Sequence, residues 1–79
     1  MLAKVYVTLK KGVHDPQGEA VLHSLNHLGF AEAENVRVGK YLEVKVKEED
    51  KSKAQERITQ MCEKLLANTV IESYRIEME

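Results

Sequence analysis

Two histidines with helical spacing come closest in this chain to a metal-binding pattern. His23 and His27 lie four residues apart, so a helix would place both imidazole rings on one side, and Glu19 one turn earlier would be a third ligand. No glutamate directly follows His23, and these side chains fall on the polar arc of the helix, which turns to solvent. We therefore expect an ordinary exposed helix face and no metal site.

A cysteine nucleophile would be another route to chemistry, and the chain has one cysteine. Cys62 follows Met61 on an apolar helical stripe, with no base beside it, so we expect a small buried hydrophobic residue. Lys10 and Lys11 precede Gly12, but no glycine-rich phosphate-binding pattern follows them. The sequence thus predicts no catalytic residue and no cofactor in this chain.

The composition predicts one small domain, spanning residues 1–79. Twelve basic and thirteen acidic side chains give a net charge of −1, which provides no electrostatic footprint for nucleic acid or an anionic membrane. The apolar runs are too short for a spanning helix or a signal peptide. A lone cysteine excludes an internal disulfide and favours a reducing, cytoplasmic location.

The first half of the chain predicts a strand, a loop and a capped helix. Residues 3–10 alternate between apolar and polar side chains, which is typical of a half-buried strand. His14 is expected in the loop that follows, beside a helix start at Asp15 and Pro16. Gly29 is expected to end the helix. The apolar arc of this helix comprises Val21, Leu22, Leu25 and Leu28, with Gly18 inside it.

The second half predicts two strands, a second helix and a final strand. Valines and a leucine on both sides of Gly39-Lys40 indicate a hairpin over residues 36–46, with these two residues as its turn. Asp50 or Ser52 should begin the second helix, and Asn68 should end it in the left-handed conformation. Residues 70–79 predict the last strand. The apolar stripe of the second helix comprises Ala54, Ile58, Met61, Cys62, Leu65 and Leu66.

The predicted element order is β-α-β-β-α-β, which defines an α+β fold of ferredoxin-like type. We expect a four-stranded antiparallel sheet with both helices on one face. The uncovered face is the candidate interface, because it combines tyrosines with charged side chains, which interfaces favour. The core of so short a chain is thin, so we expect a homodimer or tetramer. The candidate interface residues are Tyr6, Arg37, Tyr41, Glu43 and Arg75.

Three stretches together resemble one family, the PurS subunit of phosphoribosylformylglycinamidine synthase. They are DPQG at residues 15–18, VRVGKYLEV at residues 36–44 and CEKLLANTVIESYRIE at residues 62–77. DPQG by itself is a weak signal. The run KLLANTVIE followed by a tyrosine, placed after VGKYLE, is far more specific, and the resemblance extends over essentially the whole chain.

The resemblance implies a non-catalytic subunit of an ATP- and glutamine-dependent ligase in de novo purine biosynthesis. Such a subunit is needed for a large synthetase subunit and a glutaminase subunit to assemble and for ammonia to pass between them. ATP and magnesium would act in the large subunit, and no cofactor would bind this one. The family motif identifies no catalytic residue to assign to this chain.

Two other functions are compatible with the residues. A small-molecule-binding regulatory module similar to ACT domains shares this topology and pairs as dimers, and the turn at Gly12 would then hold an amino acid. A free-standing metal-binding protein would instead use His23 and His27.

Overall fold

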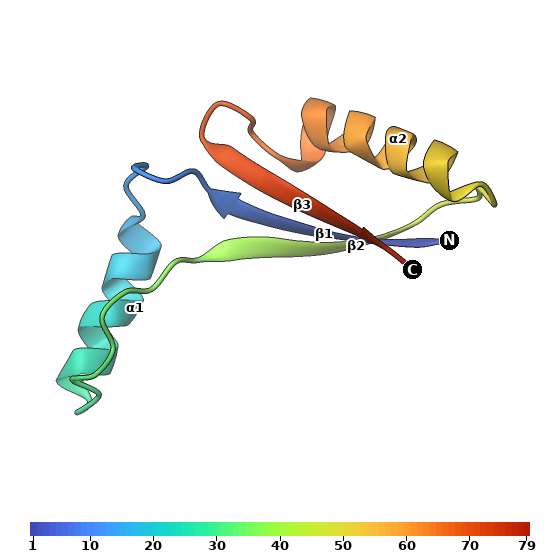
Figure 1. The fold of residues 1–79 in the computed structure, drawn as a ribbon. Helices are drawn as coiled ribbons and strands as arrows, with labels where there is room; N and C mark the ends of the chain where they lie inside the picture. The colour runs from blue at the N-terminus through green and yellow to red at the C-terminus, as the bar shows by residue number, and fades with distance from the viewer.

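The chain folds into a three-stranded antiparallel sheet with one helical layer on one face. The structure is a computed structural model that describes residues 1–79. The strands lie in the order β2-β1-β3, and the second helix with its π-helical continuation η1 covers one face of the sheet (Figure 1). The elements are β1 (Leu2–Leu9), α1 (Pro16–His27), β2 (Gly39–Lys45), α2 (Lys51–Met61), η1 (Cys62–Leu66) and β3 (Glu72–Met78).

The core lies between β1 and the α2–η1 layer. Alternate side chains of β1 are buried, as its alternating sequence predicts, and Val5 and Val7 pack in one cluster with Ile58 and Cys62. Cys62 is a free thiol with no exposed surface, and burial raises its pKa. The interpretation of Cys62 as a small buried hydrophobic residue is therefore confirmed.

The prediction that both helices cover one face of the sheet is wrong. Only α2 and η1 do so, whereas α1 lies beyond the end of the sheet, at the far end of the molecule from both termini (Figure 1). The extents are 49 × 24 × 14 Å and the radius of gyration is 15.9 Å, against about 12 Å for a compact chain of this length. We call α1 together with residues 28–38 the arm.

The predicted fourth strand is also absent, because residues 36–38 run back along α1 instead of pairing with the sheet. β2 begins at Gly39, opposite Thr8, so Gly39-Lys40 is the start of a strand and no hairpin turn. Positive φ angles occur only at Gly12 and Gly29. Gly39 therefore has no positive φ. Glycine is required there because a Cβ atom would collide with the Val7 carbonyl oxygen of β1.

The predicted helix starts are confirmed, and one of the predicted helix ends is wrong. Asp15 caps α1 with Pro16 in the first turn, and Asp50 caps α2 by accepting from the Ser52 N–H at 2.9 Å. Gly29 ends α1 with φ +103°. Asn68 is not left-handed; its side chain accepts from the Val70 N–H in a local turn. No helix has the length and apolar content needed to cross a membrane.

Candidate interaction surfaces

The face of the sheet opposite α2, called here the open face, carries an ordered row of aromatic and charged side chains. Tyr41, Tyr6 and Arg75 lie directly opposite one another on β2, β1 and β3. The two rings are 5.0 Å apart between centroids, and the Arg75 guanidinium carbon lies 4.2 Å from the Tyr6 ring centroid. Ring pairs and cation–π contacts of this kind favour particular relative positions of the side chains. The open face is therefore preorganised for contact.

One hydrogen bond extends this row along β2 to Glu43. The Tyr41 hydroxyl donates to a Glu43 carboxylate oxygen at 2.8 Å. Partial burial and this bond to an anion raise the pKa of Tyr41 to about 12. Four of the five predicted interface residues, Tyr6, Tyr41, Glu43 and Arg75, thus lie together on the open face.

The fifth predicted interface residue, Arg37, does not lie on the open face. Arg37 was placed on this face because residues 36–38 were predicted to form a fourth strand, which is absent. Its guanidinium instead donates to the backbone carbonyls of Leu9, Lys10 and Val13 at 3.1–3.4 Å. The Arg37 Nε lies 4.0 Å from the Asp15 carboxylate. Arg37 therefore ties the end of the arm to the end of β1.

Asp15, Gly18, Arg37 and Val38 form what we call the joint, where the arm meets the sheet. Asp15 is only 7% exposed, and its two carboxylate oxygens accept from the Gly18 and Val38 N–H groups, each at 2.9 Å. A Cβ at position 18 would collide with the Val36 carbonyl oxygen and lie 2.6 Å from the Asp15 carboxylate. The DPQG motif thus does more than cap a helix, because it fixes the direction of the arm.

The charge of Asp15 should make the joint sensitive to acid. The N–H groups of Val38 and Gly18 hold the pKa of Asp15 below its usual value. Because the folded pKa lies below the unfolded value of about 3.9, this stabilisation is complete above that value and is lost as the pH falls through the folded pKa. We expect Asp15→Asn to lower the urea midpoint at neutral pH, and the gap from wild type to shrink below about pH 4.

A matched variant separates this effect from general charge loss. Glu34→Gln removes an exposed carboxylate from the same arm and should keep the wild-type midpoint at neutral pH. A gap between wild type and Asp15→Asn that stays constant down to about pH 2 would contradict the assigned role of the carboxylate.

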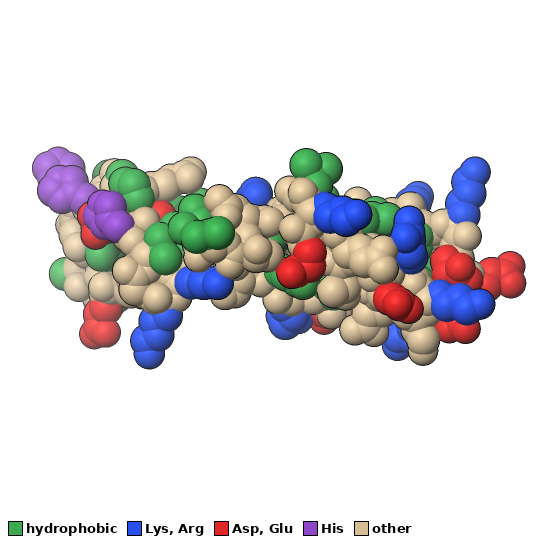
Figure 2. Space-filling view, turned by 90° about the horizontal axis from the view of Figure 1, so that it is seen from above, with side chains coloured by type: hydrophobic (Ala, Val, Ile, Leu, Met, Phe, Trp, Pro, Cys, Tyr) green, Lys and Arg blue, Asp and Glu red, His purple; other side chains and the backbone are tan.

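The arm presents apolar side chains that its own chain leaves uncovered. Val21 on α1 is 40% exposed, and Leu28, which directly follows the helix, is 71% exposed. Leu25 lies between them at helical spacing and is half-buried. Phe30 is half exposed just beyond the helix. Seen from the α2 side, green apolar side chains extend along the arm end of the molecule (Figure 2).

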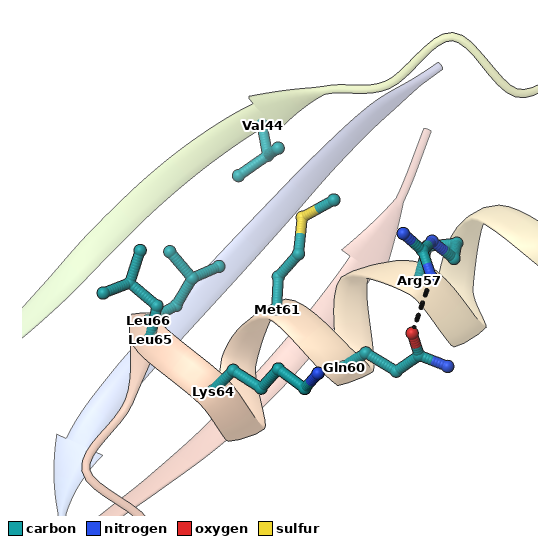
Figure 3. A pocket seen from close by; sticks show the side chains of 7 residues that line it. All are labelled: Val44, Arg57, Gln60, Met61, Lys64, Leu65 and Leu66. Carbon is teal, nitrogen blue, oxygen red and sulfur yellow. Dashed lines mark hydrogen bonds between the residues drawn. The ribbon is translucent and has the colours of Figure 1, made fainter.

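The second apolar surface is a groove between the α2–η1 layer and β2. Its volume is about 320 Å³, and Met61 points across it toward Val44 of β2 (Figure 3). Leu65 in the same wall is 83% exposed, although its stripe predicts burial. Arg57 lies at one end of the groove and bonds to Gln60 at 2.8 Å. The groove is lined by Val44, Arg57, Gln60, Met61, Lys64, Leu65 and Leu66.

The histidines do not converge on a site. His23 and His27 are exposed on α1, and His14 lies 3.4 Å from Glu19, outside the helix. No three side chains of the His, Cys, Asp and Glu types lie close enough together to hold a metal ion. Figure 2 shows purple histidine side chains at the end of the molecule that carries the arm.

Together these surfaces define a small α+β protein whose prominent features suit contact with other protein chains. The family model PurS, described as phosphoribosylformylglycinamidine (FGAM) synthase, matches residues 2–79. The chain therefore belongs to the PurS family, the S subunit of FGAM synthase, as its sequence motifs predict.

Relatives and solved structures agree with this assignment. The FGAM synthase subunit PurS of Bacillus subtilis is 51% identical over 76 residues, covering 96% of this chain and 89% of the relative. The B. subtilis PurS crystal structure superimposes with a TM-score of 0.89 at 50% identity, over 99% of this chain and 96% of that one. A chain of the PurLQS structure from Thermotoga maritima gives 0.85 at 33% identity, over 98% and 96%. These solved structures share the fold of this chain over nearly its whole length, which includes the arm.

Proposed function

We propose that this chain is a non-catalytic scaffold of FGAM synthase that brings a large synthetase subunit and a glutaminase subunit together and assists ammonia transfer between them. The family match over residues 2–79 carries the proposal, and the likeness to a chain of the T. maritima PurLQS structure supports it. The alternative of an ACT-like ligand-binding module is not favoured, since the relatives found are PurS subunits.

The open face is the proposed contact surface for another subunit. Tyr6, Tyr41 and Arg75 are residue types that dominate interface energetics, and they are held in one row. Glu43 adds a carboxylate that is already oriented by Tyr41. Arg37 contributes indirectly, by fixing the joint. No nucleic acid or membrane enters this proposal.

We also propose that the chain self-associates as a homodimer or tetramer. Its β2 and β3 strands both have a free edge, and its arm exposes leucine and phenylalanine side chains that water disfavours. A chain of this length with so extended a shape buries little apolar surface by itself.

The proposal assigns no cofactor to this chain, and ATP and magnesium to the large subunit. A cytoplasmic location is consistent with a cysteine that is a free thiol. We propose that this subunit assists ammonia transfer through its shape and not by chemistry of its own. We identify no reactive group on its open face.

Co-purification tests the scaffold role directly. A tagged synthetase subunit should retain the glutaminase subunit on a column when this chain is present and lose it when this chain is left out. Arg75→Glu should weaken retention, since reversing a central interface charge removes a contact and introduces repulsion. Lys51→Glu, an equal charge reversal at the exposed start of α2, is the control. Equal retention with and without this chain would refute the proposal.

A further inference from the structure

A polar hollow lies where the end of β1 meets the arm, and we call it the joint pocket. Its volume is about 360 Å³, and it is lined by Thr8 and Leu9 of β1, Lys11 of the loop that follows, and Asn35 and Arg37 of the arm. The loop after β1 and the end of the arm come together at this end of the sheet (Figure 1). The joint pocket shares no lining residue with the groove beside α2.

Every polar side chain that lines the joint pocket can donate a hydrogen bond. Lys11 and Arg37 are cations, and Thr8 and Asn35 add a hydroxyl group and an amide group. No carboxylate lines the pocket, and Lys11 takes part in none of the ion pairs within the chain. A hollow with two positive charges and no acidic side chain attracts an anion.

Arg37 is held in the pocket wall by contacts that leave its charge available. Its guanidinium donates to three backbone carbonyls at 3.1–3.4 Å, and these acceptors are neutral. Its one ion-pair partner is Asp15, at 4.0 Å from Nε, and both oxygens of that carboxylate already accept backbone N–H groups. A guanidinium has five N–H donors, so donors remain for a ligand. An arginine that is already immobilised also loses less entropy when a ligand binds.

The charge and the size of the joint pocket together indicate the class of ligand. Arginine and lysine are the side chains suited to phosphate groups, arginine through paired N–H donors and lysine as a point charge. The volume lies at the lower end of the range for small-molecule sites, which is about 300–1,000 Å³. Only one lining residue, Leu9, is apolar, so an apolar ligand would find little to contact. Because these donors belong to side chains, the site does not need the glycine-rich pattern that is absent after Lys11.

We propose that the joint pocket binds the phosphate group of a small molecule, with Lys11 and Arg37 as the charged contacts and Thr8 and Asn35 as further donors. The bound phosphate links β1 and its loop to the arm, because the donors come from both sides of the joint. Binding therefore stabilises the direction of the arm. The site goes beyond the scaffold role and does not depend on it.

Titration of the isotopically labelled chain with inorganic phosphate, followed by NMR, tests the site. The amide signals of residues 8–11 and 35–37 should shift in a saturable manner, and those of α2 should not. Ionic strength is held constant with sodium chloride, because salt screens contacts of this kind. Glucose 6-phosphate in a second titration distinguishes an organic phosphate, which should bind more tightly, from the free ion. Glucose is the uncharged control, and shifts as large with glucose as with its phosphate would refute the proposed chemistry.

Two substitutions of exposed lining residues test the assignment of the donors. Lys11→Gln removes a charge, and Asn35→Asp replaces a donor by an anion of the same size. Each should weaken phosphate binding about tenfold or more, since hydrogen bonds to ionised groups are among the stronger ones in proteins. Lys53→Gln and Gln55→Glu make equivalent changes at exposed positions of α2 and should bind phosphate as the wild type does. Arg37 is left unchanged, because it also holds the joint.

Urea unfolding provides a second readout, at fixed protein concentration and ionic strength. Phosphate should raise the urea midpoint of the wild-type chain, because a ligand that binds only the folded state stabilises it. The midpoint of Lys11→Gln should rise much less. Absent or non-saturable shifts, shifts spread over the whole surface, or equal binding by both pocket variants would show at most non-specific anion binding and would overturn the proposal. Co-purification of the other two subunits tests the scaffold role independently of these results.

Discussion

Omitting this chain from a mixture of the synthetase and glutaminase subunits is expected to lower glutamine-dependent FGAM formation by about tenfold or more. Holding two active sites together gives a local concentration of the transferred intermediate that free diffusion does not match, and gains of about a hundredfold are common for linked sites. The scaffold proposal makes this chain responsible for that proximity. The measurement is the rate of product formation from glutamine, with and without this chain.

Ammonium salt supplied in place of glutamine provides the control. The synthetase subunit should use free ammonia at the same rate whether this chain is present or not, because its own active site is unaltered. The glutaminase subunit should likewise remain folded by circular dichroism. Full glutamine-dependent activity from the other two subunits alone would contradict the scaffold role.

Ile58→Ala is expected to destabilise this chain severely. Ile58 has no exposed surface and packs from α2 against Val5 and Val7 of β1. Removing such a side chain typically costs about 2–5 kcal/mol, from lost burial and the cavity left behind. A 79-residue domain has a total stability of roughly 4–12 kcal/mol, so the variant should lose a large fraction of it.

Urea unfolding at a fixed protein concentration measures this loss, since self-association also contributes to stability. Val70→Ala is the control, because it deletes methyl groups from a side chain that is 80% exposed. The control should unfold within about 0.5 kcal/mol of wild type. An Ile58→Ala variant as stable as the control would show that the α2–β1 contact is not the core of this fold.

Local signals in the sequence predicted most of the elements correctly. Alternation identified β1, and the Asp15-Pro16 and Asp50 caps identified the starts of both helices. These features depend on hydrogen bonds and side-chain spacing within a few residues, so they can be recognised without knowing the rest of the fold. The family motifs could also be recognised in the sequence alone. The family match over residues 2–79 confirms the family that they predicted.

The sequence also placed four interface candidates on one face, because a strand alternates its side chains with a period of two. The prediction that Arg37 lies on this face was wrong for the same reason as the prediction of a fourth strand. Its surrounding residues alternate like a strand, but Asp15 takes the Val38 N–H that a sheet partner would need. Gly18 within an apolar helical arc was the available signal, since such a glycine often marks a close backbone approach.

The sequence alone therefore determined the helix caps, the buried strand, the family and the side chains available to the open face. Only the tertiary structure decided the direction of the arm, the missing fourth strand and the exposure of Leu65. These depend on contacts between residues far apart in the chain, such as Asp15 with Val38, and local periodicity carries no information about such contacts.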